Sequence, residues 1–357
     1  MEQTILHPEK NYLELTQYIS ERMGRKILLV CGRSFSYTRV GIYLERWANE
    51  NKIEMVRFCN FQPNPDYESV IQGTALFQEE GCDAILAAGG GSAIDVAKCI
   101  RHERGDDIVL VAIPTTAGSG SEATHFAVVY HQGIKESVDC DIPDAVLLDP
   151  ATLDTLSNYQ RKTTMLDALC HGIESFWSVN STPESRGYSK EAISLILRNA
   201  EGYLQNCPEG NAGMLQAAHK AGQAINLAQT TAGHAMCYQI TKLYGIAHGH
   251  AAALCVDKVW PYMLNHLESC IDFRGRTYLG CILEEISEVM GCNRPQEGAK
   301  KFQAILNSLK LETPKCSAEE LVMLVDSVNP VRLKNFPISL TREEIKRLYQ
   351  QILRKRD

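Results

Sequence analysis

Short apolar runs alternate with amphipathic stretches through the first 155 residues of the chain. Runs of this length that are bounded by glycine, proline or polar residues favour buried strands. We expect such strands at residues 26–31, 55–59, 83–88, 108–113 and 145–148. Helical periodicity between them predicts helices, including those at residues 67–80 and 93–102. Buried strands that alternate with helices are typical of a parallel sheet covered by helices on both faces.

The pattern changes after residue 155, where helical periodicity replaces the strand-like runs. We expect helices at residues 162–177, 183–205, 214–244, 251–267, 273–290, 295–309, 318–327 and 342–354. Thr341 and Glu344 occupy the positions of a capping box at the start of the last one. The sequence therefore predicts an α/β domain over residues 1–155, which contains a parallel sheet, and an all-helical domain over residues 156–357.

Composition narrows the class of protein. Hydrophobic residues make up 45% of the chain and charged residues 22%, as in an ordinary soluble enzyme. The net charge of −7 argues against a nucleic-acid binder, and the 13 cysteines include no C-x-x-C pair, as in a protein of the reducing cytoplasm. From the N-terminal residues and the lengths of the apolar runs we expect neither a signal peptide nor a membrane-spanning segment. We expect a cytoplasmic protein that acts on a small molecule as a homo-oligomer, a dimer, without nucleic-acid or membrane partners.

A glycine loop connects an expected strand to an expected helix. It consists of Gly89, Gly90, Gly91 and Ser92. Backbone amides at a helix N-terminus bind anions, and glycines let a diphosphate approach the chain closely. The loop is not G-x-G-x-x-G, because position 94 is Ile94, and it is not a Walker loop. A plain tight turn would also suit this sequence, so phosphate binding is a hypothesis at this point.

A second polar loop, at residues 114–122, follows the expected strand at residues 108–113. Ligands of an open parallel sheet bind beyond the carboxyl ends of its strands. Two polar loops at that edge could donate hydrogen bonds to one extended ligand. Ser119 or Ser121 could instead cap a following helix, and one residue can cap while its neighbours bind.

Carboxylate and histidine side chains suggest a metal site in the helical half. Asp167 and His171 are four residues apart in an expected helix, so they share one face. His234, His248 and His250 fall in one short, largely apolar stretch. Each element alone is more often a solvated face or a satisfied core histidine, but their density favours Fe²⁺ or Zn²⁺ in a catalytic site. The absence of H-E-x-x-H leaves a zincin protease unsupported.

Four sequence blocks match one known family. They are GGGSAIDVAK at residues 89–98, IPTTAGSGSE at 113–122, DALCHGIE at 167–174 and AHGHA at 247–251. The blocks stand in the family's order and at similar spacing, and over residues 25–265 the chain resembles the iron-containing alcohol dehydrogenases. The resemblance implies an N-terminal dinucleotide-binding α/β domain, a C-terminal helical domain, and a metal-dependent, NAD(P)-linked alcohol dehydrogenase or aldehyde reductase.

The resemblance also implies which residues form the sites. The implied metal ligands are Asp167, His171, His234 and His248. The implied diphosphate contacts are Gly90, Gly91 and Ser92. The positions implied to line the nicotinamide side of the cofactor are Thr115, Thr116 and Ser119. Further positions that match the cofactor site are Asn64, Asp95 and Lys135.

The chain departs from the family pattern after the expected strand at residues 26–31. Many NAD-specific relatives have an aspartate there, whereas this chain has Gly32, Arg33 and Ser34. Loss of the carboxylate removes repulsion against a 2′-phosphate, and Arg33 or Ser34 could contact that group. We therefore expect NADPH to be accepted beside NADH, and we hypothesise a preference for NADPH. In the alternative interpretation, Gly32 is only a turn residue.

Tyr238 marks a second departure. Relatives often carry a second histidine four residues after the first, close to the substrate, and here Tyr238 follows His234 at that spacing. A phenol can relay a proton, although its ordinary pKa is near ~10. Tyr238 could equally line the wall of the pocket, and His250 is a rival candidate for the relay.

Residues 231–254 look most like the phosphonoacetaldehyde reductase branch of this family. That likeness implies reduction of phosphonoacetaldehyde to 2-hydroxyethylphosphonate, with simple short-chain aldehydes as the main alternative. A dianionic phosphonate needs a cationic partner, and Lys242, one turn beyond Tyr238, is a candidate. A solvated surface lysine is an equally good interpretation of Lys242.

Two other functions stay open at this point. Dehydroquinate synthase-like lyases share the architecture, a nicotinamide and a metal, but their metal site normally begins with a glutamate rather than a residue like Asp167. A non-catalytic binding module is the third alternative. The intact metal set and the intact glycine loop count against it.

Overall fold

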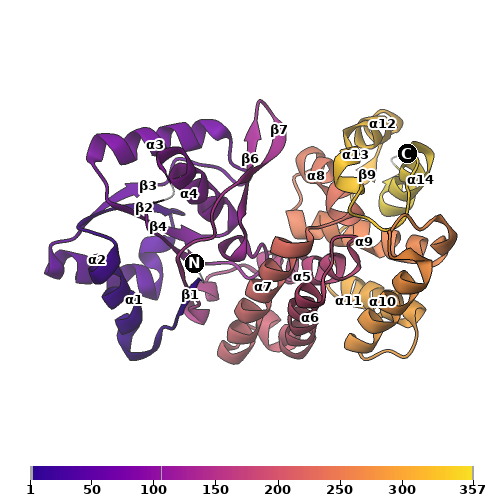
Figure 1. The fold of residues 1–357 in the computed structure, drawn as a ribbon, viewed down its shortest axis with the longest axis horizontal. Helices are drawn as coiled ribbons and strands as arrows, with labels where there is room; N and C mark the ends of the chain where they lie inside the picture. Colours follow the sequence, from indigo (N-terminus) through magenta and orange to yellow (C-terminus); the bar gives the residue numbers. More distant parts are fainter. Residues whose placement is uncertain (1–2, 106, 356–357) are drawn as a thin grey trace. The chain divides into compact units, whose positions relative to one another are not determined.

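The computed structural model describes residues 3–105 and 107–355. These residues group by contact into two units (Figure 1). The α/β unit runs to Leu156 and includes Glu201–Gly222, whereas the helical unit contains Ser157–Ala200 and the chain from Gln223 onward. The sequence pattern placed residues 201–222 with the helices. The expected division into domains at residues 155 and 156 stays a prediction.

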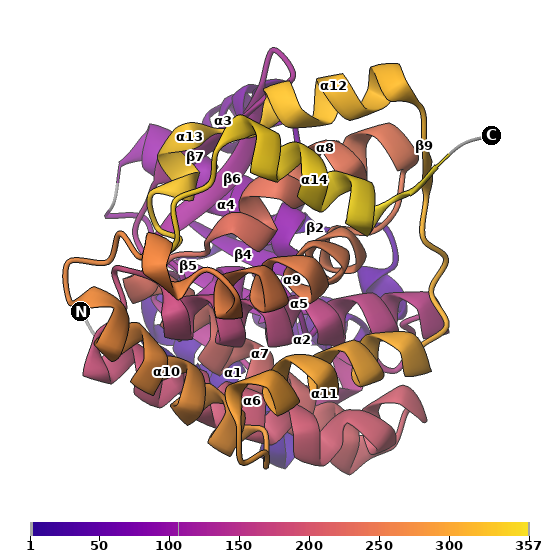
Figure 2. The ribbon, with the colours of Figure 1, turned by 90° about the vertical axis from the view of Figure 1, so that its right-hand side faces the viewer.

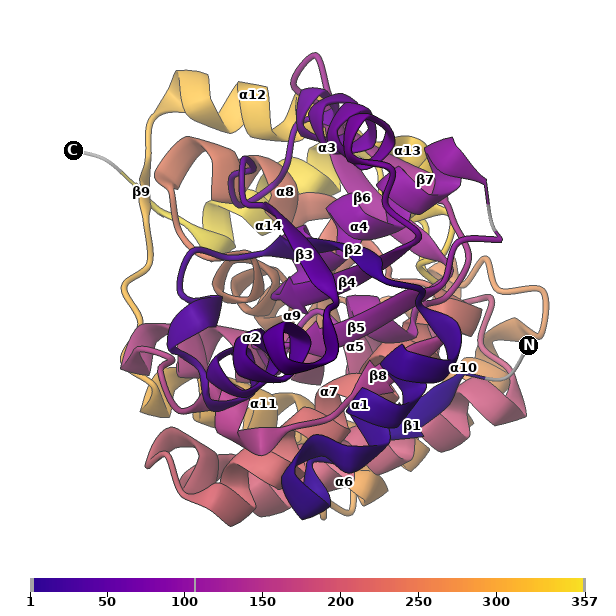
Figure 3. The ribbon, with the colours of Figure 1, turned by 90° about the vertical axis from the view of Figure 1, so that its left-hand side faces the viewer.

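Within the described residues, the α/β unit contains a parallel sheet of six strands in the order β1-β8-β5-β4-β2-β3 (Figure 3). Its strands are β1 (Thr4–Leu6), β2 (Lys26–Cys31), β3 (Glu54–Phe58), β4 (Ala84–Gly89), β5 (Leu110–Pro114) and β8 (Ala145–Leu147). The expected parallel sheet is therefore confirmed, and the ends of the five expected strands shift by no more than two residues. The short strand β1 was not predicted, because three residues carry too little periodicity.

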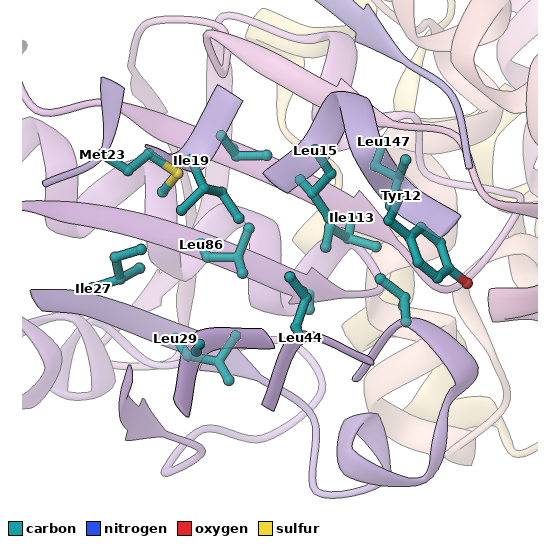
Figure 4. Close-up of a cluster of buried hydrophobic side chains, with 14 of the residues drawn as sticks. Tyr12, Leu15, Ile19, Met23, Ile27, Leu29, Leu44, Leu86, Ile113 and Leu147 are labelled. Carbon is teal, nitrogen blue, oxygen red and sulfur yellow. The ribbon is translucent and has the colours of Figure 1, made fainter. Parts of the chain in front are cut away.

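Helices cover both faces of this sheet, with α1 (Glu9–Arg22) and α2 (Arg39–Asn51) on one face and α3 (Tyr67–Glu80) and α4 (Gly91–Arg104) on the other (Figure 1). Strand side chains alternate between the two faces. The core under α1 and α2 includes Leu15, Ile19, Ile27, Leu29, Leu44, Leu86 and Ile113 (Figure 4). The core under α3 and α4 includes Leu28, Val30, Val70, Phe77, Ile85 and Ile94.

An antiparallel hairpin of β6 (Phe126–His131) and β7 (Ile134–Asp139) also belongs to the α/β unit. Gln132 and Gly133 form its turn, and both have positive φ angles, as in the turns that suit two-residue hairpins. The hairpin was not predicted, because Gln-Gly is not one of the strong hairpin signals.

The helical unit is organised around α9 (His248–Leu264), which among the described residues packs most extensively against four other helices (Figure 2). These are α5 (Asn158–Trp177), α8 (Ala232–Tyr244), α11 (Pro295–Ser308) and α14 (Arg342–Ile352). The other α-helices and strands described in this half of the chain are α6 (Pro183–Leu204), α7 (Pro208–Ala228), α10 (Gly275–Val289), α12 (Ala318–Ser327), α13 (Pro330–Leu333), β9 (Lys315–Cys316) and β10 (Arg354–Lys355). The capping box of Thr341 and Glu344 is confirmed at the start of α14.

The single helix expected at residues 214–244 is wrong, because the chain forms α7 and α8 there. Gln229 takes a left-handed conformation with φ 60° just after α7, which ends the helix. The apolar periodicity continues across this break and gives no sign of it. Within the described residues, no helix is both long enough and apolar enough to cross a membrane.

Candidate active site

Asp167, His234 and His248 come together in the helical unit. Asp167 lies on α5, His234 in the first turn of α8, and His248 at the start of α9. One candidate ligand atom from each lies within 4.8 Å of the other two. Asp167 Oδ1 and His234 Nε2 are buried 3.6 Å apart, and neither has a hydrogen-bond partner within the described residues. Buried polar atoms rarely lack partners, so this cluster fits a bound cation, and its donor types suit Fe²⁺ or Zn²⁺.

His171, the fourth expected ligand, lies one turn after Asp167 on α5. Its ring stacks on that of His234, with centroids 4.6 Å apart and an interplanar angle of 19°. Among the described residues, the three-atom cluster does not include it, and its role as a ligand stays a prediction. Burial would raise the pKa of Asp167, but His171, His234 and His248 together hold that pKa well below its usual range.

Glu174 fixes the orientation of His234. Its Oε2 pairs with His234 Nδ1, while its Oε1 accepts hydrogen bonds from the amides of Thr231 (3.0 Å) and Gly233 (2.9 Å). Burial would lower the pKa of His234, but the carboxylates of Glu174 and Asp167 outweigh it and raise the pKa to about 9. The contact with Glu174 Oε2 favours a proton on Nδ1, and Nε2 is directed at Asp167.

Gly249 allows α9 to approach α5. A Cβ at this position would collide with the carbonyl oxygen of Thr163 and lie 2.6 Å from Asp167 Cβ. Only glycine can therefore stand here without moving one helix. Because His248 precedes Gly249, this close approach brings the His248 imidazole beside Asp167.

Three loops meet at the carboxyl edge of the sheet in the α/β unit, after the neighbouring strands β2, β4 and β5. The Gly32 amide donates to Ala88 O (3.3 Å), and the Thr115 amide donates to Gly89 O (2.9 Å), which ties the three loops together. Ligands of open parallel sheets bind at this edge, and β4 lies where the chain order reverses.

Gly90 and Gly91 let the glycine loop lie against the loop that follows β5. A Cβ on Gly90 would be 3.1 Å from the side chain of Thr116, and one on Gly91 would be 2.9 Å from Ser119 Oγ. Gly90 is the N-cap of α4 and Gly91 its first residue, so the amides of the first turn face the same region. The structure thus brings the expected diphosphate residues next to Thr116 and Ser119.

Two family models match the chain, one described as iron-containing alcohol dehydrogenase over residues 3–150 and one as the Fe-containing alcohol dehydrogenase family, C-terminal, over residues 162–353. The chain belongs to the iron-containing alcohol dehydrogenase family. The resemblance of the four sequence blocks is confirmed, and so is the expectation of an iron-type alcohol dehydrogenase.

The dehydrogenase is 30% identical over 300 residues to the phosphonoacetaldehyde reductase of Streptomyces viridochromogenes, a match that covers 74% of this chain and 75% of the relative. An iron-containing alcohol dehydrogenase from Thermotoga maritima has a TM-score of 0.83 and 26% identity over 99% of this chain and 98% of that one. The sulfoacetaldehyde reductase of Bifidobacterium kashiwanohense in complex with NAD⁺ has a TM-score of 0.83, 23% identity and coverage of 98% and 96%. This last likeness shows the fold.

Tyr238 of the dehydrogenase lies beside the cluster of candidate metal ligands. Its ring is stacked on that of His248, with centroids 5.3 Å apart and an interplanar angle of 7°. Arg332 of α13 donates from Nη1 to Tyr238 Oη at 2.9 Å. The sequence could not show this contact, because 94 positions separate the two residues. Lys242, the cation proposed from the sequence, is exposed in the last turn of α8.

His250 of the dehydrogenase lies on α9 two residues after His248, a rotation of about 200° around the helix. Its Nδ1 is 3.3 Å from Tyr159 Oη, which accepts a hydrogen bond from the Ala247 amide at 2.9 Å. Burial lowers the pKa of His250 to about 4. Tyr238 stacks on the cluster residue His248, whereas His250 contacts Tyr159. This difference favours Tyr238 over His250 as the side chain nearer to the cluster, and the proton-relay role of either stays a prediction.

The expected cofactor positions Asn64, Asp95 and Lys135 lie on different elements of the α/β unit. The Asn64 amide donates to Ser92 Oγ at 3.3 Å, which places Asn64 beside the glycine loop. Asp95 accepts hydrogen bonds from Ser121 Oγ and from the Val128 amide (3.1 Å), so it anchors the chain that follows the second loop. Lys135 lies in the β6–β7 hairpin. Cofactor contacts of all three stay predictions.

Glu174 is the site residue that the sequence could have revealed. It follows His171 by three positions and Asp167 by seven on α5, which puts all three on one helix face. A carboxylate at that spacing is a natural partner for the distal nitrogen of a metal-binding histidine.

Proposed function

We propose that this dehydrogenase reduces a small aldehyde to a primary alcohol with NADPH or NADH and a divalent metal, Fe²⁺ or Zn²⁺. The observation that carries the proposal is the cluster of buried Asp167 and His234 with half-buried His248, in which Asp167 Oδ1 and His234 Nε2 have no hydrogen-bond partner within the described residues. His171 is proposed as the fourth ligand, because its ring lies against His234.

The residues have distinct tasks in this reaction. When bound, the metal polarises the carbonyl group and the reduced nicotinamide supplies the hydride. Asp167, His234 and His248 hold the metal, and Glu174 keeps His234 in the orientation that binds it. Tyr238 Oη donates the proton that the product alcohol needs. Because Arg332 donates to this oxygen, the guanidinium stabilises the phenolate that remains.

The coenzyme binds to the loops at the edge of the sheet. The first-turn amides of α4, with Gly90, Gly91 and Ser92, hold the diphosphate. Thr115, Thr116 and Ser119 line the nicotinamide side, and Asn64, Asp95 and Lys135 complete this region. Arg33 and Ser34 are exposed after β2, where they can reach a 2′-phosphate, so we propose that NADPH is preferred.

Phosphonoacetaldehyde, reduced to 2-hydroxyethylphosphonate, is the proposed substrate. The relative from Streptomyces viridochromogenes supports it, because its match covers three quarters of both chains. General short-chain aldehydes are the second candidate, favoured by 30% identity to a 1,3-propanediol dehydrogenase of Klebsiella pneumoniae over 265 residues. We also propose that the dehydrogenase acts in the cytoplasm as a dimer.

One assay tests the function. The absorbance of NADPH and of NADH is followed with a panel of aldehydes that includes phosphonoacetaldehyde, before chelation, after chelation, and after addition of Fe²⁺ or Zn²⁺. We expect metal-dependent oxidation of the coenzyme. Absence of turnover with every aldehyde in the metal-loaded enzyme would refute the proposal.

A further inference from the structure

We propose that Arg332 selects the substrate by binding a tetrahedral oxyanion that the aldehyde carries on the carbon next to its carbonyl group. The substrate class is thereby a phosphonate-bearing or sulfonate-bearing acetaldehyde. The inference rests on the aldehyde-reducing function proposed above, and it assigns to Arg332 a task that no sequence motif indicates.

A chain of ring contacts connects Arg332 to the metal cluster. The His248 ring, which supplies one of the three clustered ligand atoms, is covered by the Tyr238 ring in a nearly parallel stack. The guanidinium carbon of Arg332 lies 5.0 Å from the centroid of that Tyr238 ring. The Tyr238 ring therefore lies between the Arg332 guanidinium and His248, the residue at which the reacting carbonyl group of the substrate would lie.

This separation suits a short bifunctional substrate. In an acetaldehyde that carries a phosphonate or a sulfonate, two single bonds separate the carbonyl carbon from the phosphorus or sulfur atom. In the proposed binding mode the carbonyl group lies at the cluster and the oxyanion points along the Tyr238 side chain toward Arg332. A neutral substrate of the same length would make no charge-assisted hydrogen bond with the guanidinium.

The chemistry of arginine fits this task better than that of lysine. A guanidinium has five N–H donors in a fixed plane and binds tetrahedral oxyanions in a bidentate manner. The carboxylates of Asp167 and Glu174 together offset the two positive charges of a divalent metal in the cluster, so the charge that attracts a dianion has to come from another residue. Arg332 and Tyr238 are both partly exposed, which leaves them accessible to a small molecule.

Arg332 is held in place by its surroundings as well as by Tyr238. Pro330 is the first residue of α13, and the Asn329 side chain caps this helix by accepting from the Val331 amide at 2.9 Å. Asn335 then donates to Gln229 Oε1 at 2.9 Å, which ties the segment to the chain just before α8. A specificity residue in such a fixed segment loses little conformational freedom when it binds its ligand.

The test compares three aldehydes in the metal-loaded holoenzyme: phosphonoacetaldehyde, sulfoacetaldehyde and neutral propionaldehyde. For Arg332→Gln, we expect the ratio of kcat/KM for phosphonoacetaldehyde to that for propionaldehyde to fall about 100-fold, as when charge-assisted hydrogen bonds are lost. For the sulfonate monoanion we expect a fall of about 10-fold, and Arg332→Lys should recover part of both losses. Lys334→Gln is the matched control, because it removes an exposed positive charge two residues away and should leave the ratios unchanged.

A binding measurement separates this inference from turnover. Calorimetry with 2-hydroxyethylphosphonate and with 1-propanol measures whether Arg332→Gln weakens binding of the phosphonate alone. Equal losses with all three aldehydes, or unchanged phosphonate binding in Arg332→Gln, would overturn the inference. A wild-type preference for propionaldehyde would overturn it too while the dehydrogenase function stands. If no aldehyde is turned over, the proposed function fails, and the binding measurement still decides whether Arg332 holds the oxyanion.

Discussion

Glu174 holds the imidazole of His234 through the ring nitrogen that faces away from Asp167. Its other carboxylate oxygen is occupied by backbone amides, including that of Gly233. The carboxylate can therefore neither rotate nor be replaced by water without leaving buried donors unpaired. This pair explains why His234 Nε2 is directed into the cluster although no described residue donates to it or accepts from it.

We predict that Glu174→Gln weakens metal binding about 10- to 100-fold, because the orienting carboxylate beyond the ligand is lost. Titration of the metal-free protein with Zn²⁺ against a chromophoric chelator measures the affinity. Glu184→Gln, the same substitution at an exposed position on α6, is the control and should leave the affinity unchanged. If Glu174→Gln binds metal as tightly as the wild type, Glu174 does not support the site.

Removal of the metal should abolish turnover and lower the melting temperature. A metal that binds only the folded state stabilises that state, and the stabilisation grows with the logarithm of the metal concentration divided by Kd. Here the side chains that would bind the metal come from three helices, α5, α8 and α9, so the metal would join them. Activity and thermal unfolding are measured after chelation and again after addition of Fe²⁺ or Zn²⁺. A chelated protein that keeps full activity and the same melting temperature would contradict a catalytic metal in this cluster.

The sequence predicted the sheet well because its central strands β2, β4 and β5 are buried on both faces. Strand β2, for example, is almost entirely apolar, and its boundaries match the expectation. The break after Gln229 was missed because it depends on one left-handed residue inside a continuous apolar pattern. Local periodicity thus reveals which segments are buried, but not where a single backbone angle ends a helix.

The residues of the candidate site also fall into two groups, those that the sequence can predict and those that it cannot. Asp167 and His171 were found because helical spacing places them on one face, and Glu174 could have been found by the same reasoning. Arg332 could not, because its contact with Tyr238 joins segments 94 positions apart that only the folded chain brings together. Local spacing thus finds residues on one helix, whereas long-range contacts require the structure.

Coenzyme choice should depend on Gly32. A Cβ at this position would have no heavy atom within 4 Å, so an aspartate fits without displacing its neighbours. Its carboxylate would accept from the ribose hydroxyls of NADH and repel the 2′-phosphate of NADPH. We expect Gly32→Asp to lower the ratio of kcat/KM for NADPH to that for NADH about 100-fold.

Gly187→Asp serves as the control for that substitution, because Gly187 of α6 also has open space at its Cβ position. It should leave the coenzyme ratio unchanged. Arg33→Ala should lower kcat/KM for NADPH and leave that for NADH nearly constant. If the wild type strongly prefers NADH, or if Gly32→Asp changes neither value, Gly32 is only a turn residue.

Gly249→Ala should destabilise the helical unit, because the added methyl group collides with the backbone of Thr163 on α5. Overpacking of this kind costs about 1–3 kcal/mol, and the shift of α9 should also weaken metal binding. Chemical denaturation of the metal-free protein measures the first effect and metal titration the second.

Gly280→Ala on α10 is the control, because the new methyl group meets nothing within 4 Å, and it should instead stabilise the protein by about 0.5–1 kcal/mol. Equal effects of the two substitutions would contradict close packing at Gly249.

Tyr238→Phe tests the proton relay. This substitution keeps the ring that stacks on His248 but removes the hydroxyl, which accepts from Arg332 and can donate its own proton. Loss of a positioned acid typically lowers the reaction rate about 10²–10⁴-fold, so we expect kcat for aldehyde reduction to fall at least about 100-fold. We expect the solvent isotope effect on kcat to decrease as well. Tyr262→Phe is the matched control, because it removes from α9 a hydroxyl that donates to Glu344 of α14. His250→Gln tests the rival residue: an intact kcat in Tyr238→Phe combined with a large loss in His250→Gln would transfer the relay to His250. An intact kcat in both variants would leave Tyr238 as a wall of the pocket and require water to deliver the proton.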